Sequence, residues 1–163
     1  MRTIIALSVL MLPLSSLSQS LTYSDADNSS EAVGLIKGTV IASQTVLAEC
    51  TRRFPDQASE MRSNLAIWQK QEAGVIAKVE YFWAEMKRED ARLGEMEAQL
   101  ASGALNQFEL LEKAWTLGDK SQPQVQVVRQ YCGKYFRNLA SGVWRARTPK
   151  AYRYMDDAPK PPG

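Results

Sequence analysis

Residues 33–54 read VGLIKGTVIASQTVLAECTRRF, and their apolar positions recur at steps of three and four. The positions that follow this spacing are Val33, Ile36, Val40, Ser43, Leu47, Cys50 and Phe54. Such steps place side chains on one face of an α-helix. The polar run at 28–30 can cap the helix at its start, and Pro55 cannot continue it. The stretch therefore predicts a helix with one apolar face, on which Cys50 points into the core.

The same spacing recurs along the rest of the chain. It predicts four further helices: one through Met61, Leu65 and Trp68, one over residues 75–101, one over 104–117 and one over 124–141. Gly74 is the expected bend before the long helix, and Ser102-Gly103 is its expected end. No stretch alternates with the period of two that half-buried strands need. The predicted fold class is all-α, a single-domain bundle of four to five helices. The aromatic side chains expected in its core are Trp68, Phe82, Phe108 and Trp115.

The chain has two cysteines, Cys50 and Cys132, and both lie on apolar helix faces. Two cysteines without histidine cannot complete the four-ligand shell of a zinc site, and a nucleophilic cysteine would lack its usual base. In an oxidising compartment the two thiols are expected to form a disulfide across 82 positions. This bond would make the first and last helices neighbours and close the bundle.

The N-terminal residues predict export. Arg2 precedes an apolar run that ends at Leu14, and Ser16-Leu17-Ser18 offers the small residues that signal peptidases read. An uncleaved anchor is the alternative, although a spanning helix needs about 20 residues. The predicted location is periplasmic or secreted, with no membrane span after cleavage. The predicted segments are a signal peptide at 1–18, a flexible lead-in at 19–28, a helical bundle at 29–142 and a basic, aromatic, extended tail at 143–163.

The chain of 163 residues contains no histidine, which removes Ser–His and Cys–His catalysis and histidine-based metal sites. It also lacks glycine-rich phosphate loops and known nucleophile motifs. Glutamates such as Glu80, Glu85 and Glu112 are candidate acids or bases, but they lie at intrahelical pairing distance from Lys and Arg. That arrangement is typical of a solvated charged face. No enzymatic activity, cofactor or metal is therefore expected.

Charge is unevenly distributed, although the net charge is only +2. Residues 72–119 hold ten acids and five bases, whereas residues 120–155 hold eight bases and no acid. The basic stretch also carries aromatic side chains, and arginines with aromatics are typical of protein interfaces. The residues predicted to contact a partner are Arg137, Trp144, Arg145, Arg147, Tyr152, Arg153 and Tyr154. Two alternatives remain: the basic helix packs beside the acidic helices, or the segment past residue 142 folds back over the core.

A small exported helical protein with one long-range disulfide is typical of two functional classes. The first is a soluble, non-enzymatic inhibitor or immunity protein, whose partner is a protein with an acidic surface, such as a toxin or a cell-wall enzyme. The second is a periplasmic chaperone or an envelope stress or structural protein that acts through long amphipathic helices. Nucleic acid is not expected as a partner because the chain is predicted to be exported.

Overall fold

A computed structural model describes residues 25–118 and 122–162, and this part of the chain contains helices but no strand. The elements are α1 (Ser29–Arg53), a 3-10 turn η1 (Pro55–Gln57), α2 (Ala58–Gln71), α3 (Ala73–Glu89), α4 (Arg92–Leu117), α5 (Gln124–Ala140), α6 (Val143–Arg147) and α7 (Pro149–Asp157). The prediction of an all-α bundle is therefore confirmed. The predicted signal peptide and most of the lead-in lie outside the described residues.

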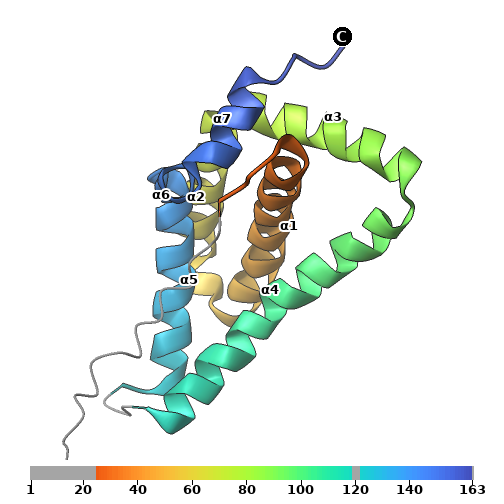
Figure 1. The fold of residues 1–163 in the computed structure, drawn as a ribbon. Coiled ribbons are helices and arrows are strands. Elements are labelled where there is room, and N and C mark those ends of the chain that lie inside the picture. Colours follow the sequence, from red (N-terminus) through yellow and green to blue (C-terminus); the bar gives the residue numbers. More distant parts are fainter. Residues whose placement is uncertain (1–24, 119–121, 163) are drawn as a thin grey trace, which may run out of the picture.

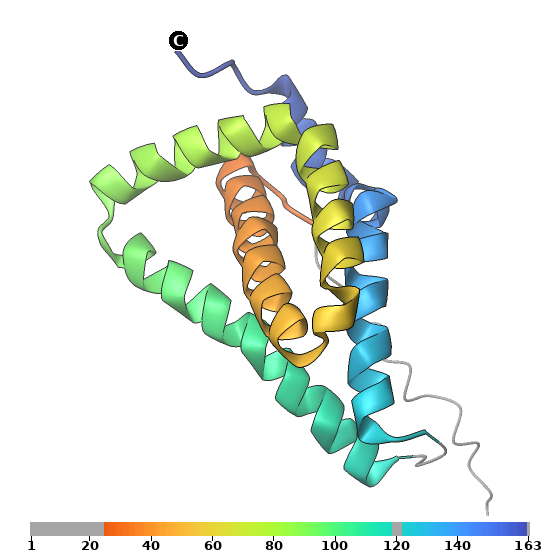
Figure 2. The ribbon, with the colours of Figure 1, turned by 180° about the vertical axis from the view of Figure 1, so that it is seen from behind.

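Helix α1 is the central element of the bundle. It contacts α2, α3, α4, α5 and α7, and Figures 1 and 2 show it inside a frame formed by α3, α4 and the paired α2 and α5. The side chain of Asn28 caps its start by accepting a hydrogen bond from the Glu31 N–H at 2.9 Å. The helix ends at Arg53, directly before Phe54-Pro55, as the sequence predicts.

The disulfide between Cys50 and Cys132 joins α1 to α5, with a Cα–Cα distance of 5.8 Å across 82 positions. This confirms the predicted pairing and the closure of the bundle. One core cluster surrounds the bond and includes Trp68, Phe108 and Phe136. A second cluster lies at the opposite end of α1, where α3 and α7 pack against it.

The predicted boundary between the third and fourth helices is wrong. Helix α4 runs without interruption through Ser102-Gly103, and the break lies at Asp90. A Cβ at Gly103 would meet nothing within 4 Å, so this glycine marks no turn or close approach. Asp90 has extended backbone angles, and its carboxylate accepts a hydrogen bond from the Arg92 N–H at 3.0 Å. A short acidic side chain that bonds nearby backbone in this way competes with helix continuation. The bend expected at Gly74 falls at Glu72, between α2 and α3.

The predicted aromatic core is correct at Trp68 and Phe108, which are both buried. Phe82 and Trp115 are only half-buried, and Trp83 is the buried aromatic of α3. Phe82 and Trp83 lie three and four positions after Val79, and both steps keep a side chain near the same helix face. The Trp83 indole also donates a hydrogen bond to Glu97 of α4 at 2.7 Å, which holds this ring at the inner side of α3.

The prediction of an extended C-terminal tail is also wrong. Residues 143–157 form α6 and α7, and α7 packs on α1 and α3 with Ala151, Tyr152 and Met155 buried. Gly142 turns the chain after α5 with a φ of 74°, a conformation that glycine adopts without steric cost. Pro149 is the first residue of α7, where its missing N–H is not needed. Within the described part of this segment, Thr148 between the two helices and residues 158–162 lie outside a helix.

Candidate functional site

The sequence-predicted contact residue Arg145 is half-buried and pairs with two carboxylates of its own chain. Its guanidinium bonds the Glu72 carboxylate at 2.7 and 3.0 Å and Asp156 at 2.8 Å, and it lies 4.4 Å from the centre of the Tyr152 ring. The Glu72 side chain is 7% exposed. The hydrogen bonds with Glu72 raise the pKa of Arg145 above its usual value. Arg145 therefore ties α6 to the junction of α2 and α3 and to α7.

The two predicted tyrosines also have internal roles. Tyr152 is 3% exposed, and burial raises the pKa of its phenol to about 12. The Tyr154 hydroxyl donates a hydrogen bond to the backbone carbonyl of Asp27 at 2.9 Å. The Asp25 carboxylate accepts hydrogen bonds from the N–H groups of Lys150 and Ala151 at 2.7 and 3.0 Å. Asp25 thereby caps α7 from a position before α1, which fixes the C-terminal helix to the start of the bundle.

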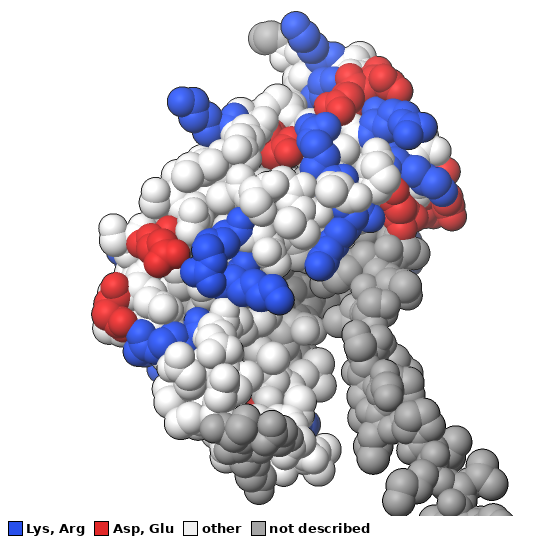
Figure 3. Space-filling view, turned by 90° about the vertical axis from the view of Figure 1, so that its left-hand side faces the viewer, with Lys and Arg blue, Asp and Glu red and all other residues white. Residues whose placement is uncertain are grey.

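Two cations of α5 pair with acids of η1 and α2. Arg137 contacts Glu60 at 3.2 Å, and Arg129 contacts Asp56 at 2.5 Å. Figure 3 shows this face of the molecule, on which acidic side chains at both margins lie against basic ones. The basic stretch is thus partly balanced within the chain, by acids of η1, α2 and the Glu72 junction. Arg153 is exposed on α7.

The remaining predicted residues, Trp144 and Arg147, line a groove of about 1090 Å³ between α1, α4, α5 and α6. Its floor is formed by α1 residues Gly34, Leu35, Gly38, Thr39, Ala42 and Val46. One wall is formed by α4 residues Met96, Gln99, Leu100, Gly103, Ala104 and Gln107. The other is formed by Tyr131, Lys134, Tyr135, Asn138, Trp144, Arg147 and Thr148. In Figures 1 and 2, α4 and α5 approach each other at one end and diverge toward the other, with α1 between them.

Small side chains give the groove its depth. A Cβ at Gly34 would meet nothing within 4 Å, and one at Gly38 would meet only the Leu100 side chain, at 3.5 Å. Ala42 continues the same edge of α1 four positions further on. Glycine in a helix interior costs about 1 kcal/mol relative to alanine. Two glycines four positions apart beside an apolar stripe are the sequence signal that could have located this floor.

The wall formed by α5 and α6 combines aromatic rings with positive charge. The ring centres of Tyr135 and Trp144 lie 6.3 Å apart, and those of Tyr131 and Tyr135 lie 5.9 Å apart. Lys134 and Arg147 are exposed on this wall. Among the described residues, no Asp or Glu lines the groove. The site therefore favours an occupant with apolar surface and negative charge.

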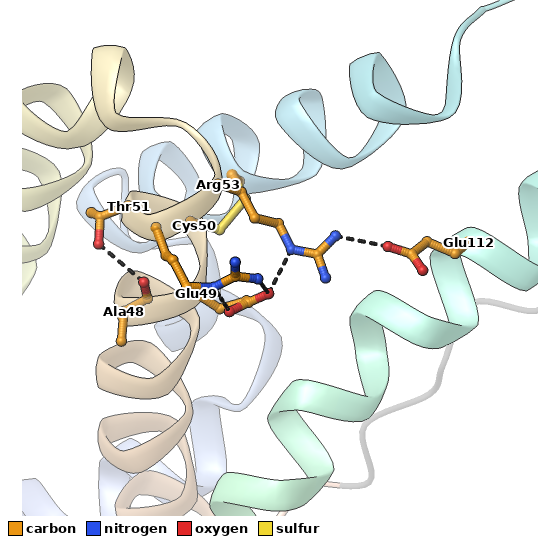
Figure 4. Close-up of polar contacts among 8 residues, drawn as sticks. Ala48, Glu49, Cys50, Thr51, Arg53 and Glu112 are labelled. Atoms are coloured by element: carbon orange, nitrogen blue, oxygen red, sulfur yellow. Dashed lines mark hydrogen bonds and ion pairs between the residues drawn. A yellow bond between two sulfur atoms is a disulfide. The ribbon is translucent and has the colours of Figure 1, made fainter.

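Ion pairs fix α4 against α1. Arg53 lies between two carboxylates, Glu49 of its own helix at 2.6 Å and Glu112 of α4 at 2.7 Å (Figure 4). A hydrogen bond from Arg52, together with a weaker effect of the one from Arg53, lowers the pKa of Glu49 to about 2. Burial acts in the opposite direction and raises this pKa. Farther along α1, Lys37 contacts Glu80 of α3 at 2.6 Å and Glu97 of α4 at 3.8 Å. The α4 wall of the groove is thus anchored at both ends of α1.

Comparisons with known proteins add no relative: no protein-family model, curated protein or solved structure matches the chain. Within residues 25–118 and 122–162, no group of three or more Cys, Asp or Glu side chains could hold a metal ion. In that same part of the chain, no helix combines the length and apolarity needed to span a bilayer. The groove is therefore the candidate site on which a function can be argued.

Proposed function

We propose that the protein is an exported, non-enzymatic binding protein of the inhibitor or immunity type, and that its partner is a protein with an acidic surface. The observation that carries the proposal is the groove, which joins an apolar floor and three aromatic rings to Lys134 and Arg147, with no lining acid among the described residues. Protein interfaces commonly use aromatic side chains as anchors and arginine for charged contacts. Complementary charges add specificity and speed the encounter.

The disulfide supports a site of action outside the cytosol. Such bonds persist in oxidising compartments such as the periplasm or the extracellular space, and the pairing of Cys50 with Cys132 leaves no free cysteine in the described chain. A toxin or a cell-wall enzyme acting in that compartment is the class of partner that an exported inhibitor would meet.

The proposal is tested by affinity capture from a periplasmic extract with three forms of the protein. The first is the unchanged protein, and the second carries Lys134→Glu and Arg147→Glu in the groove. The third is a charge-matched control with Arg62→Glu and Lys70→Glu, two exposed cations of α2 outside the groove. One stoichiometric acidic partner, lost with the groove variant and kept with the control, is the expected result. Equal capture by all three forms would contradict the proposal.

The outer face of α4 favours a second candidate function, an envelope chaperone. Leu110 and Leu117 lie seven positions apart on one side of the helix and are 55% and 90% exposed, and exposed apolar side chains along one helix can hold unfolded segments. A chaperone would capture a broad set of envelope proteins in the same experiment. Replacement of Lys134 and Arg147 would then change that set little.

A further inference from the structure

The groove has the dimensions of a helix site. Its floor runs along α1 from Gly34 to Val46, and its α4 wall runs from Met96 to Gln107. At 1.5 Å per residue these stretches span about 18 and about 16 Å. A volume of about 1090 Å³ is larger than most small-molecule sites, which occupy roughly 300–1,000 Å³ and enclose their ligand. An amphipathic helix laid between two helices is a recurring mode of peptide recognition.

We infer that the groove binds one amphipathic α-helix of the partner, about three turns long, with its apolar face on α1 and carboxylates along the edge that faces α5 and α6. This inference rests on the proposed function and specifies how the partner binds. Both cations, Lys134 and Arg147, belong to the same wall, whereas the α4 wall offers the neutral amides of Gln99 and Gln107. A partner helix would therefore meet positive charge only along the edge that faces α5 and α6.

The aromatic rings and the small residues of the groove determine which apolar side chains the partner's helix can carry. Trp144 and Tyr135 are partly buried against the core, so their rings are held in place before the partner arrives. Rigid aromatic surface gives contact area at little cost in side-chain entropy. Gly34, Gly38 and Ala42 leave room at the floor for large aliphatic side chains. Leu, Ile or Met at positions i, i+3, i+4 and i+7 would meet this floor.

Two glycines allow the groove to be filled without disturbing the core. A Cβ at Gly34 or at Gly103 would meet nothing within 4 Å, and both residues line the groove. Gly74 has the same open surroundings but lies outside the groove, on α3. The variant Gly34→Leu/Gly103→Leu therefore blocks the site, and Gly74→Leu is its matched control. Both variants are expected to fold, since replacing glycine in a helix favours the helical state.

The experiment is a selection from a displayed library of random 14-residue peptides on the full-length protein, with counter-selection on Gly34→Leu/Gly103→Leu. The expected outcome is enrichment of peptides with apolar residues at helical spacing and with Asp or Glu on one flank. An enriched peptide should bind Gly74→Leu as it binds the unchanged protein. It should bind the blocked variant and Lys134→Glu/Arg147→Glu at least tenfold more weakly, measured by fluorescence anisotropy.

Three outcomes would overturn the inference. They are no enrichment, enrichment of extended or basic peptides, and equal binding to the blocked variant. Oleate that binds the groove while no peptide is enriched would assign it to a lipid anion instead. Failure here is distinct from failure of the proposed function. A partner captured through Lys134 and Arg147 but not through a helix would overturn only the inference, whereas capture of no partner would overturn the proposed function.

Discussion

Replacing Arg145 by glutamine is expected to destabilise the fold by about 2–3 kcal/mol, even though the arginine lies near the surface. The reason is its partner: the Glu72 side chain is 7% exposed and accepts two hydrogen bonds from Arg145, at 2.7 and 3.0 Å. Removing one member of a fully buried ion pair costs about 3–5 kcal/mol, because the other charge is left unpaired. The Arg145 side chain is 40% exposed, so water partly solvates the site and the expected cost falls just below that range, at about 2–3 kcal/mol.

The assay is urea and thermal unfolding followed by circular dichroism. For a domain of 150–250 residues, 1 kcal/mol shifts Tm by about 2–4 °C, so Arg145→Gln should lower Tm by about 4–12 °C. Arg147→Gln is the control, because Arg147 is an exposed residue of the same short helix and its loss should change stability by less than about 0.5 kcal/mol.

A second substitution separates the buried charge from other effects of the change. Glu72→Gln in the Arg145→Gln background removes the unpaired charge and should restore part of the lost stability. If Arg145→Gln is as stable as Arg147→Gln, the role given to this ion pair in holding α6 and α7 is wrong.

Three other predictions concern titration and the disulfide. Burial raises the pKa of Tyr152 to about 12, so its contribution to stability is complete below pH ~10 and is lost toward pH ~12, by up to about 1.4 kcal/mol per pH unit. Tyr152→Phe should flatten that part of a pH series of unfolding curves. The pKa of Glu49 is lowered to about 2, so its contribution is complete above pH ~4.5 and is lost as pH falls toward 2. Glu49→Gln should reduce the loss of stability measured over that range. Replacing Cys50 and Cys132 together by alanine should cost roughly 4–5 kcal/mol in urea unfolding for a loop of 82 positions; an unchanged midpoint would contradict this.

Local periodicity was enough to predict the helical class and the disulfide. The faces of α1 and α5 are defined by side chains three and four positions apart, so Cys50 and Cys132 could be assigned to the core before their contact was known. The periodicity does not predict the break at Asp90, because the break depends on one side-chain hydrogen bond to the Arg92 N–H. Apolar spacing on either side of it reads as one continuous helix.

The groove and the C-terminal helices could not be predicted in the same way. The floor and walls of the groove come from four helices, and the angles between these helices depend on tertiary packing rather than on any single stretch. The prolines of the C-terminal segment predict an extended tail. Its helical state depends on partners that lie more than 70 positions away, since Arg145 pairs with Glu72 and Asp25 caps α7.

The contact between Asp25 and the start of α7 spans 125 positions, nearly the whole length that the structure describes. A bond of this kind cannot form before Lys150 has been synthesised, and long-range contacts of this sort slow folding because a large loop must close first. The second core cluster, which includes Val33, Val79 and Tyr152, is likewise incomplete until α7 packs against α1 and α3. The native state therefore requires α7 as well as α1, and the part of the described chain before α7 cannot complete it alone.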